Sequence, residues 1–345
     1  MEKGSIKFFL FLGLILFSGL PFLPAFSQQL TQIESGLNTS LRGLSVVNHS
    51  VIWVSGSKGY TALSTDAGKT WKWNQVKGFE KFDFRDIEGF SENKAVMVSA
   101  GSPAVILLTV NGGKDWEEVY RNSLPDIFLD GMDFWNADHG IIYGDPIAGQ
   151  IQILETTNGG MSWQNISHRL KIKLVSGEAG FAASGTGIRS GKKGNVWIAT
   201  GGIRSRIFHS KDYGQSWQVY PCPIIQGNAS SGIFSIAFYN KKTGVAAGGD
   251  YLKDTLRNNN LLITGNGGQS WKSPKINPLG YRSAIEYVSR KVLIATGTTG
   301  TDISGDGGLT WKKLSDTGFN CVRKAKNGKL IVLTGDQGRI ALVQQ

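Results

Sequence analysis

Cysteine and histidine are scarce in this sequence. Its 345 residues contain 2 cysteines and 4 histidines. Two cysteines cannot staple a scaffold of this length; a disulfide is chemically allowed after export, but we expect Cys222 and Cys321 to be unpaired small hydrophobic side chains. The histidines lack the short spacings of zinc ligands and stand at His49, His139, His168 and His209. The sequence therefore predicts neither a disulfide framework nor a metal site.

Long apolar runs are absent after the amino-terminal segment. Lys3 and Lys7 precede an apolar run over residues 8–17, and small residues follow it, which is the layout of a secretory signal peptide. The run is too short to favour a membrane-spanning helix, although an uncleaved anchor is the alternative. We expect residues 1–27 to be a cleaved signal peptide. Residues 28–345 would then be exported to the periplasm or the extracellular space, without stable membrane insertion.

Charged residues make up only 18% of the chain, and positive ones dominate. Lys plus Arg number 37 against 26 Asp plus Glu, so the formal net charge is +11 and the surface should attract anions. The basic residues are dispersed and exported proteins rarely meet nucleic acid, so nucleic-acid binding is not expected. With 40% hydrophobic residues the chain can bury a large core, which excludes a disordered or collagen-like protein.

One eight-residue pattern, Ser/Thr-x-Asp/Asn-x-Gly-x-Ser/Thr-Trp, recurs six times. Successive Trp residues stand 45, 47, 54, 54 and 40 positions apart, a spacing that suits a four-stranded unit. The second copy departs from the pattern, with Asp115 where Ser or Thr is usual, and this should weaken one turn. The Asp or Asn and the Trp of the six copies are Asp66 and Trp71, Asn111 and Trp116, Asn158 and Trp163, Asp212 and Trp217, Asn266 and Trp271, and Asp306 and Trp311.

The octet has the chemistry of a hairpin turn. Its Asp or Asn accepts hydrogen bonds from nearby amides, its Gly adopts positive φ, and its Ser or Thr adds local bonds. Alternating apolar runs precede each copy and begin again at its Trp, so each octet should join the third and outer strands of a unit. The Trp should then bury its indole where neighbouring units meet.

The last unit supplies only three strands, whereas the mature amino terminus offers a spare one. Pairing residues 30–33 with residues 340–343 would complete a seventh sheet and remove two exposed sheet edges. The sequence therefore predicts one all-β domain, a seven-bladed β-propeller closed into a ring by the N-terminal strand.

The octet is identified as the Asp box, or bacterial neuraminidase repeat, of sialidases, other propeller glycosidases, sortilin-like receptors and photosystem II stability and assembly factors. The seven-unit layout, the signal peptide and segments such as residues 84–87 make the chain similar to the photosystem II assembly-factor family. Residues 144–149, 181–186 and 248–251 also resemble stretches of uncharacterised secreted bacterial proteins. The resemblance implies a protein-binding scaffold with an arginine patch on one face; it does not imply a photosynthetic host.

Propeller geometry sorts the loops onto two faces. The Asp boxes share one face with the turns between first and second strands, and most irregular connections lie on the other, where rigid scaffolds usually bind ligands. We expect an arginine-containing funnel there, in which Arg side chains hold a carboxylate, a phosphate or an acidic protein segment. The alternative is that these charges pair across blades and only fasten loops. The candidate binding residues are Arg42, Arg85, Asp130, Arg204, Arg206 and Arg282.

The predicted function is an exported, monomeric, non-catalytic binding or assembly scaffold that recognises a protein segment or an anionic ligand and needs no cofactor. The alternative is a glycoside hydrolase, sialidase-like or of another propeller type, with Asp145, Glu178 and Asp250 as the candidate catalytic acids. Residues 84–87 lack the Pro of the sialidase entry motif, aromatic-Arg-Ile-Pro, and this argues against the hydrolase.

Residues 185–193 superficially suggest a phosphate-binding loop because they are rich in glycine and end in two lysines. Only three residues separate Gly187 from Gly191, however, and Lys193 stands where Ser or Thr would hold magnesium. We therefore interpret the stretch as a polar connection.

Overall fold

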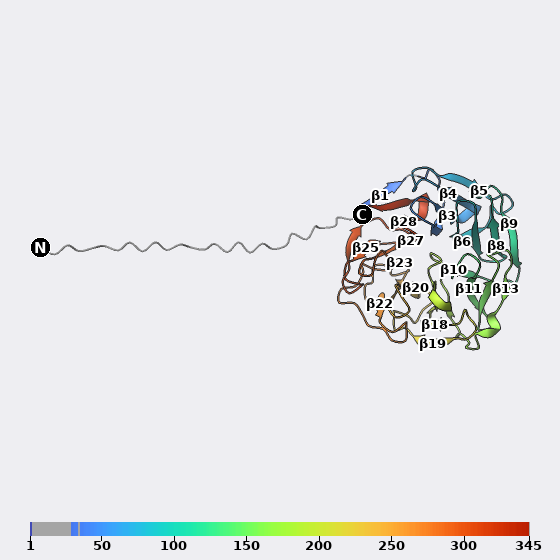
Figure 1. Cartoon of the computed structure of the whole chain (residues 1–345). Coiled ribbons are helices and arrows are strands. Elements are labelled where there is room, and N and C mark those ends of the chain that lie inside the picture. The colour runs from blue at the N-terminus through green and yellow to red at the C-terminus, as the bar shows by residue number, and fades with distance from the viewer. Residues whose placement is uncertain (2–28, 34, 345) are drawn as a thin grey trace.

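Seven sheets are arranged around a central axis like the blades of a propeller (Figure 1). The computed structural model describes Met1 and residues 29–33 and 35–344; Met1 apart, the expected signal peptide lies outside the described residues. Within these ranges the architecture confirms the predicted all-β, seven-bladed propeller. No helix in the described part of the chain is long and apolar enough to cross a membrane.

The blades are numbered in chain order, each from its inner to its outer strand. Blades 1 to 3 comprise β2 (Leu41–Val46), β3 (Ile52–Gly56), β4 (Tyr60–Ser64) and β5 (Lys72–Gln75); β6 (Asp83–Gly89), β7 (Ala95–Ala100), β8 (Ala104–Thr109) and β9 (Glu117–Asn122); and β10 (Leu129–Phe134), β11 (Gly140–Ile147), β12 (Gln150–Thr156) and β13 (Gln164–Asn165). Blades 4 and 5 comprise β15 (Ile188–Gly191), β16 (Asn195–Ala199), β18 (Arg206–Ser210) and β19 (Gln218–Pro221); and β20 (Ser231–Phe238), β21 (Gly244–Asp250) and β22 (Leu261–Thr264), beside β14 (Glu178–Ala179) and β17 (Gly201–Gly202). Blades 6 and 7 comprise β23 (Ala284–Tyr287), β24 (Leu293–Gly297), β25 (Gly300–Ser304) and β26 (Lys312–Ser315); and β27 (Cys321–Lys324), β28 (Ile331–Thr334), β29 (Ile340–Gln344) and β1 (Gln29–Ile33). Short 3-10 turns are η1 (Ser57–Gly59), η2 (Ser167–Arg169), η3 (Lys192–Gly194) and η4 (Asp336–Gly338).

The ring is closed by the N-terminal strand, as the sequence predicts. Strand β1 is the outer strand of blade 7 and runs antiparallel to β29, with Leu30 opposite Val343 and Ile33 opposite Ile340. Leu30 packs on the core between blades 6 and 7, and Ile33 packs on the core between blades 7 and 1. Closure therefore buries apolar side chains as well as pairing two strand edges.

Blade 5 departs from the regular four strands. Its outer strand is reduced to a single bridge between Ile263 and Lys272. Pro274 follows two residues later, and proline has no amide hydrogen with which to extend a ladder. On its inner side the blade instead gains β14 and β17, which come from the connections before and within blade 4.

The Asp-box turns are built as their sequence predicts. In the first copy the Ser64 hydroxyl accepts a hydrogen bond from the Gly68 amide at 2.8 Å, and Asp66 accepts one from the Thr70 amide at 2.9 Å. The copy that contains Asp115 keeps the side-chain hydrogen bond of the turn, because the Asn111 side-chain amide donates to the Asp115 carboxylate at 2.9 Å. The expected weakening of this turn is therefore absent from its hydrogen bonding.

Each Asp-box Trp packs in the apolar core shared with the preceding blade. In four copies the indole N–H donates to the glycine carbonyl of the same octet, for example from Trp71 to Gly68 at 3.1 Å. Trp116 instead meets Trp53 of the preceding blade edge-on, and Trp163 meets Phe134 of its own blade edge-on. The buried indole N–H groups of Trp116 and Trp163 have no hydrogen-bond partner among the described residues. Packing between blades therefore determines the burial of these rings.

Candidate functional site

Four inner strands carry a β-bulge near their first residues. The pairing register shifts at Arg42 in β2, Arg85 in β6, Asp130 in β10 and Phe234 in β20. A bulged residue is left out of the ladder, so its side chain can be aimed away from the blade interface. All four side chains line one cavity of about 540 Å³ on the face opposite the Asp boxes, which we call the funnel.

The funnel is formed by six of the seven blades and by one connection. The connection, between blades 3 and 4, contributes residues 179–183. Besides the bulged positions, the blades contribute Phe128, Asp145, Tyr251, Tyr281, Ser283, Thr298, Asn320 and Asp336. The predicted residues Arg42, Arg85 and Asp130 are thus brought together, with aromatic side chains that the sequence analysis did not single out.

Both funnel arginines hold the connection that enters the ring. Arg42 Nη1 donates to the Ala183 carbonyl at 2.9 Å, and Arg85 Nη1 donates to the Ala182 carbonyl at 3.4 Å. We call residues 181–186 the plug. A guanidinium group has five N–H donors, so one bond to the plug leaves further donors on each arginine.

The far end of the plug is fastened to the opposite side of the ring. The Ser184 hydroxyl donates to the Ser283 carbonyl at 2.8 Å, and the Thr186 hydroxyl donates to the Ser235 hydroxyl at 2.6 Å. The plug therefore joins blades 1 and 2 to blades 5 and 6 across the central axis. A ligand in the funnel would rest against the plug.

Gly185 is the point at which the plug passes the buried Asp86. Asp86 accepts hydrogen bonds from its neighbour Ile87 at 2.9 Å and from Met132 of the next blade at 2.8 Å. Burial raises the pKa of Asp86 to about 8, although nearby Arg323 opposes the shift. A Cβ on Gly185 would lie 2.2 Å from the carboxyl carbon, and its φ of +67° also favours glycine.

Asp130 and Asp145 form an acidic pair in the funnel wall. Both Asp130 oxygens are buried and lack a donor among the described residues, whereas Asp145 accepts a hydrogen bond from Gly180 at 2.8 Å. Burial, and then the neighbouring Asp145 carboxylate, raises the pKa of Asp130 well above its usual value, and burial also raises the pKa of Asp145. A proton held between the two carboxyl groups gives one of the orphaned oxygens a hydrogen bond to Asp145. The arginines consequently face less negative charge than two carboxylates would give.

The remaining acid of the funnel is held in its charged form. Hydrogen bonds from Ser40 and Asn320, helped by the positive charge of Arg42, outweigh burial and lower the pKa of Asp336. Asp336 lies at the start of η4, so it fixes the loop of blade 7 beside Arg42. The cationic side of the funnel is therefore preorganised.

An aromatic wall faces the arginines. Phe181 of the plug stacks on Phe234 with ring centroids 3.8 Å apart and an interplanar angle of 15°. Tyr281 meets Phe234 edge-on at 4.8 Å, and Tyr251 does so at 6.1 Å. Tyr251 is 45% exposed, whereas Phe234 and Tyr281 are buried. The funnel thus combines guanidinium donors with an apolar surface.

The other three predicted arginines do not line the funnel. Arg282 is fully buried and donates to Asp302 at 2.8 Å. Arg206 is also buried and donates to Glu178 through two nitrogens, at 2.7 and 2.6 Å. Arg204 is exposed but lies outside the funnel lining. Arg206 and Arg282 thus fasten loops, which is the alternative that the sequence analysis left open.

A one-residue offset explains the position of Arg282. Ala284 and Gly43 occupy equivalent positions in their blades. Ala284 is the first paired residue of β23, and Gly43 is the first paired residue after the bulge of β2. The residue that corresponds to Arg42 is therefore Ser283, and it does line the funnel. Because successive side chains of an extended chain point to opposite sides, Arg282 points into the protein instead.

Of the three acids considered for a hydrolase, Asp145 and Glu178 line a shared cavity of about 520 Å³ beside the funnel, and Asp250 lies outside it. Asp145 lines the funnel, whereas Glu178 is buried against Arg206. The Asp250 carboxylate accepts a hydrogen bond from the Leu252 amide at 3.0 Å; this and other local hydrogen bonds outweigh burial and lower the pKa of Asp250. These three acids do not converge on one pocket.

Cys222 and Cys321 are buried and unpaired. Within residues 29–33 and 35–344, no group of three or more His, Cys, Asp or Glu side chains is placed to hold a metal ion.

Comparison with known proteins supports the fold. Residues 23–127 match the family model described as Photosynthesis system II assembly factor YCF48. No curated protein matches the sequence. A solved structure described as YCF48 bound to D1 peptide has a TM-score of 0.66 and 13% identity, covering 94% of this chain and 96% of that one.

Two further solved structures have the same architecture. YCF48 from Cyanidioschyzon merolae gives a TM-score of 0.64 at 15% identity, covering 91% of this chain and 98% of that one. The WD40 β-propeller domain of Doa1 gives 0.63 at 10% identity, with coverages of 93% and 98%. These likenesses show the propeller fold, and the family match confirms the resemblance inferred from the Asp boxes.

Proposed function

We propose that this propeller, similar to the YCF48 assembly factors, is a non-catalytic scaffold that binds an extended protein segment in the funnel. The observation that carries the proposal is the set of equivalent bulges that aim Arg42, Arg85 and Phe234 into one cavity above the plug. The solved YCF48 complex contains a peptide, which supports a peptide as the class of ligand here. The identity of that peptide is not carried over.

The chemistry of the funnel favours a segment with a carboxylate next to an apolar side chain. Arg42 and Arg85 have spare N–H donors that can hold a carboxylate, either of Asp or Glu or of a chain terminus. The ring of Tyr251 is accessible beside them and can pack against an aliphatic or aromatic side chain of the segment. The protonated Asp130–Asp145 pair reduces repulsion of an incoming carboxylate.

The cellular setting of this proposal comes from the sequence alone. The amino-terminal layout of basic, apolar and small residues supports export to the periplasm or the extracellular space. Strand β1 covers the edge that β29 would otherwise expose, so blade 7 is completed within one chain, which supports a monomer.

The test is capture of partner proteins from native envelope by the mature domain, with crosslinking and mass spectrometry. Reversing both funnel charges, with Arg42→Glu and Arg85→Glu, should abolish capture of the principal partner. Any capture that remains should no longer depend on salt concentration. The matched control is Arg290→Glu with Lys291→Glu, two exposed residues in the β23–β24 turn on the opposite face.

The outcome is read only for variants that melt within a few degrees of the wild type, because both arginines also hold the plug. Arg42→Gln with Arg85→Gln provides a milder pair if the reversed variant unfolds. Capture that survives in folded funnel variants, or that falls equally in the control, would show that the funnel is not the binding site.

A further inference from the structure

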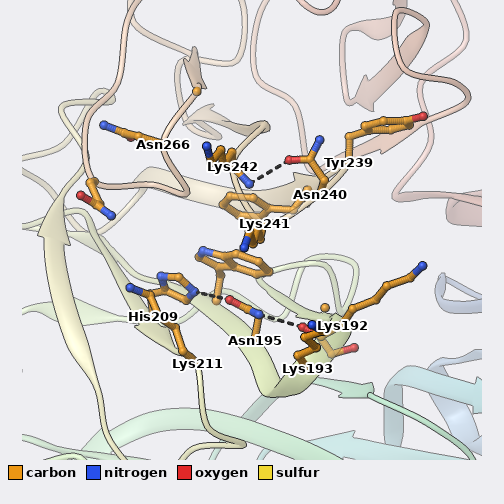
Figure 2. Close-up of a pocket in the computed structure, with 16 residues that line it drawn as sticks. Lys192, Lys193, Asn195, His209, Lys211, Tyr239, Asn240, Lys241, Lys242 and Asn266 are labelled. Carbon is orange, nitrogen blue, oxygen red and sulfur yellow. Dashed lines mark hydrogen bonds between the residues drawn. The ribbon is translucent and has the colours of Figure 1, made fainter.

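A second cavity, of about 940 Å³, lies between blades 4 and 5 on the Asp-box face (Figure 2). Its rim carries five lysines from three separate loops. Lys192 and Lys193 belong to η3, and Lys211 belongs to the Asp box of blade 4. Lys241 and Lys242 come from the turn between β20 and β21 on the other wall. We call this cavity the lysine pocket.

The lysine pocket has no negative side chain to balance this charge. No Asp or Glu among the described residues lines it, and all five lysines are exposed. None of the five ammonium groups forms an ion pair or a hydrogen bond with a described residue. Several uncompensated charges around one concave surface give a local positive potential that attracts anions.

The wall of the pocket is rigid and aromatic. Trp197 stacks on Phe238 with ring centroids 4.0 Å apart and on His209 at 4.6 Å. The Asn195 side-chain amide donates to the Lys192 carbonyl at 2.7 Å, so its oxygen is the acceptor for His209 Nε2 at 3.1 Å. Burial, and then nearby Lys211, lowers the pKa of His209 to about 4. His209 is neutral at pH 7, and the positive charge of the pocket comes from its lysines.

We infer that the lysine pocket binds a ligand that carries clustered phosphate groups. Planar carboxylates are matched best by the paired donors of arginine, and no arginine lines this pocket. Ammonium groups act as point charges, so lysines arriving from three loops can surround a compact, multivalent, tetrahedral anion. A cavity of this volume is in the range of small-molecule sites.

The site is distinct from the nucleotide-binding loops that residues 185–193 superficially suggest. Lys192 and Lys193 lie in a tight turn between two antiparallel strands, with Lys193 at a φ of +60°. A phosphate-binding loop precedes a helix whose N-terminus faces the ligand, and no helix follows this turn. The side chains that line this pocket come from two neighbouring blades, so no single stretch of sequence predicts it.

The experiment is a calorimetric titration of the mature domain with inorganic tripolyphosphate at low and physiological salt. The test variant replaces four rim lysines with Gln, at Lys192, Lys193, Lys241 and Lys242. The matched control makes the same charge change on the far side of the ring, at the exposed residues Lys69, Lys72, Lys77 and Lys81. We expect the dissociation constant to rise about tenfold or more in the test variant and by less than about twofold in the control.

Two further probes determine the class and source of the ligand. A hexaglutamate peptide should bind more weakly than tripolyphosphate; equal affinity would overturn the assignment to phosphate. The second probe is a vesicle of phosphatidylcholine with phosphatidic acid. If the wild type binds these vesicles and the test variant does not, the source of the phosphate is a lipid headgroup. Tripolyphosphate binding without vesicle binding would make it a soluble phosphate. Absence of tripolyphosphate binding, or equal losses in test and control variants, would overturn the proposal.

Discussion

The two faces of the propeller carry positive charge in different ways. On the funnel face, Arg42 and Arg85 are held by plug carbonyls, and Arg85 also pairs with Asp83 at 2.7 Å. Around the lysine pocket, no described carboxylate pairs with the five ammonium groups. Guanidinium groups held in place present N–H donors in a defined geometry, so they select a ligand by the positions of its acceptors. Unpaired ammonium groups create a positive electrostatic potential, so they select a ligand mainly by its negative charge.

The difference follows from where each set lies in a blade. Funnel side chains come from bulges in inner strands, which are packed on both sides by neighbouring blades. The lysines come from turns at the surface, where each side chain is free to reorient. We therefore expect binding at the funnel to depend on geometry and binding at the lysine pocket to depend mainly on ionic strength.

The largest effect should come from a substitution that separates stability from binding. Trp163→Ala removes a ring that packs edge-on against Phe134 at 5.9 Å, and it should lower the free energy of unfolding by about 3–5 kcal/mol. Because this ring lies in a blade interface far from both cavities, ligand capture by the folded variant should not change. Thermal melts and pulldowns measure the two quantities.

A conservative variant at the same position provides the control. The Trp163 indole N–H has no hydrogen-bond partner among the described residues, so Trp163→Phe gives up no bond and keeps an edge-on contact. It should cost about 1 kcal/mol. A Trp163→Ala melt that matches the wild type would contradict the assignment of these rings to the core between blades.

The fold could be predicted from the sequence because its signals are local. Each octet fixes a hairpin by turn chemistry within eight residues, as the bonds of Ser64 and Asp66 show. Closure was predictable because the last unit lacks one strand and residues 30–33 supply it. What local signals missed is the shortened outer strand of blade 5 and the added strands β14 and β17, which depend on proline placement and on distant pairing.

The candidate site was only partly predictable, because side-chain direction depends on register. Arg42, Arg85 and Asp130 line the funnel, whereas Arg282 is offset by one residue and therefore points into the protein. The plug lies in a long connection without periodicity, so its path across the axis has no sequence signal. The lysine pocket likewise depends on how two blades stand side by side.

A substitution in the funnel wall tests its protonated pair. A carboxyl group whose pKa is raised on folding stabilises the protein at low pH, and that stability is lost as the pH rises through the raised pKa. Asp130 is such a group, whereas Asn at this position stays neutral and can donate to Asp145. The melting temperature of Asp130→Asn relative to wild type should therefore increase between pH 5 and pH 9. The exposed Asp126→Asn is the control and should show a flat difference; a flat difference for Asp130→Asn would refute the shared proton.

The smallest effect concerns the Asp-box face, where donor and acceptor must match within a turn. Asn158 donates to the Ser162 hydroxyl at 2.8 Å, whereas Asn111 donates to the Asp115 carboxylate at 2.9 Å. Asn158→Asp can accept from that hydroxyl, as Asp212 does from Ser216 at 2.5 Å, so its stability should change by less than about 0.5 kcal/mol.

Asn111→Asp would instead set two carboxylates against each other. It removes a hydrogen bond and adds like-charge repulsion, so it should destabilise the domain by about 1 kcal/mol. Urea titrations of the two variants at pH 7 measure the difference, and at pH 3, where the added carboxyl group becomes protonated, the two costs should converge. Equal stabilities at pH 7 would mean that exposed turn bonds on this face contribute little, and that packing between blades alone holds the Asp boxes in place.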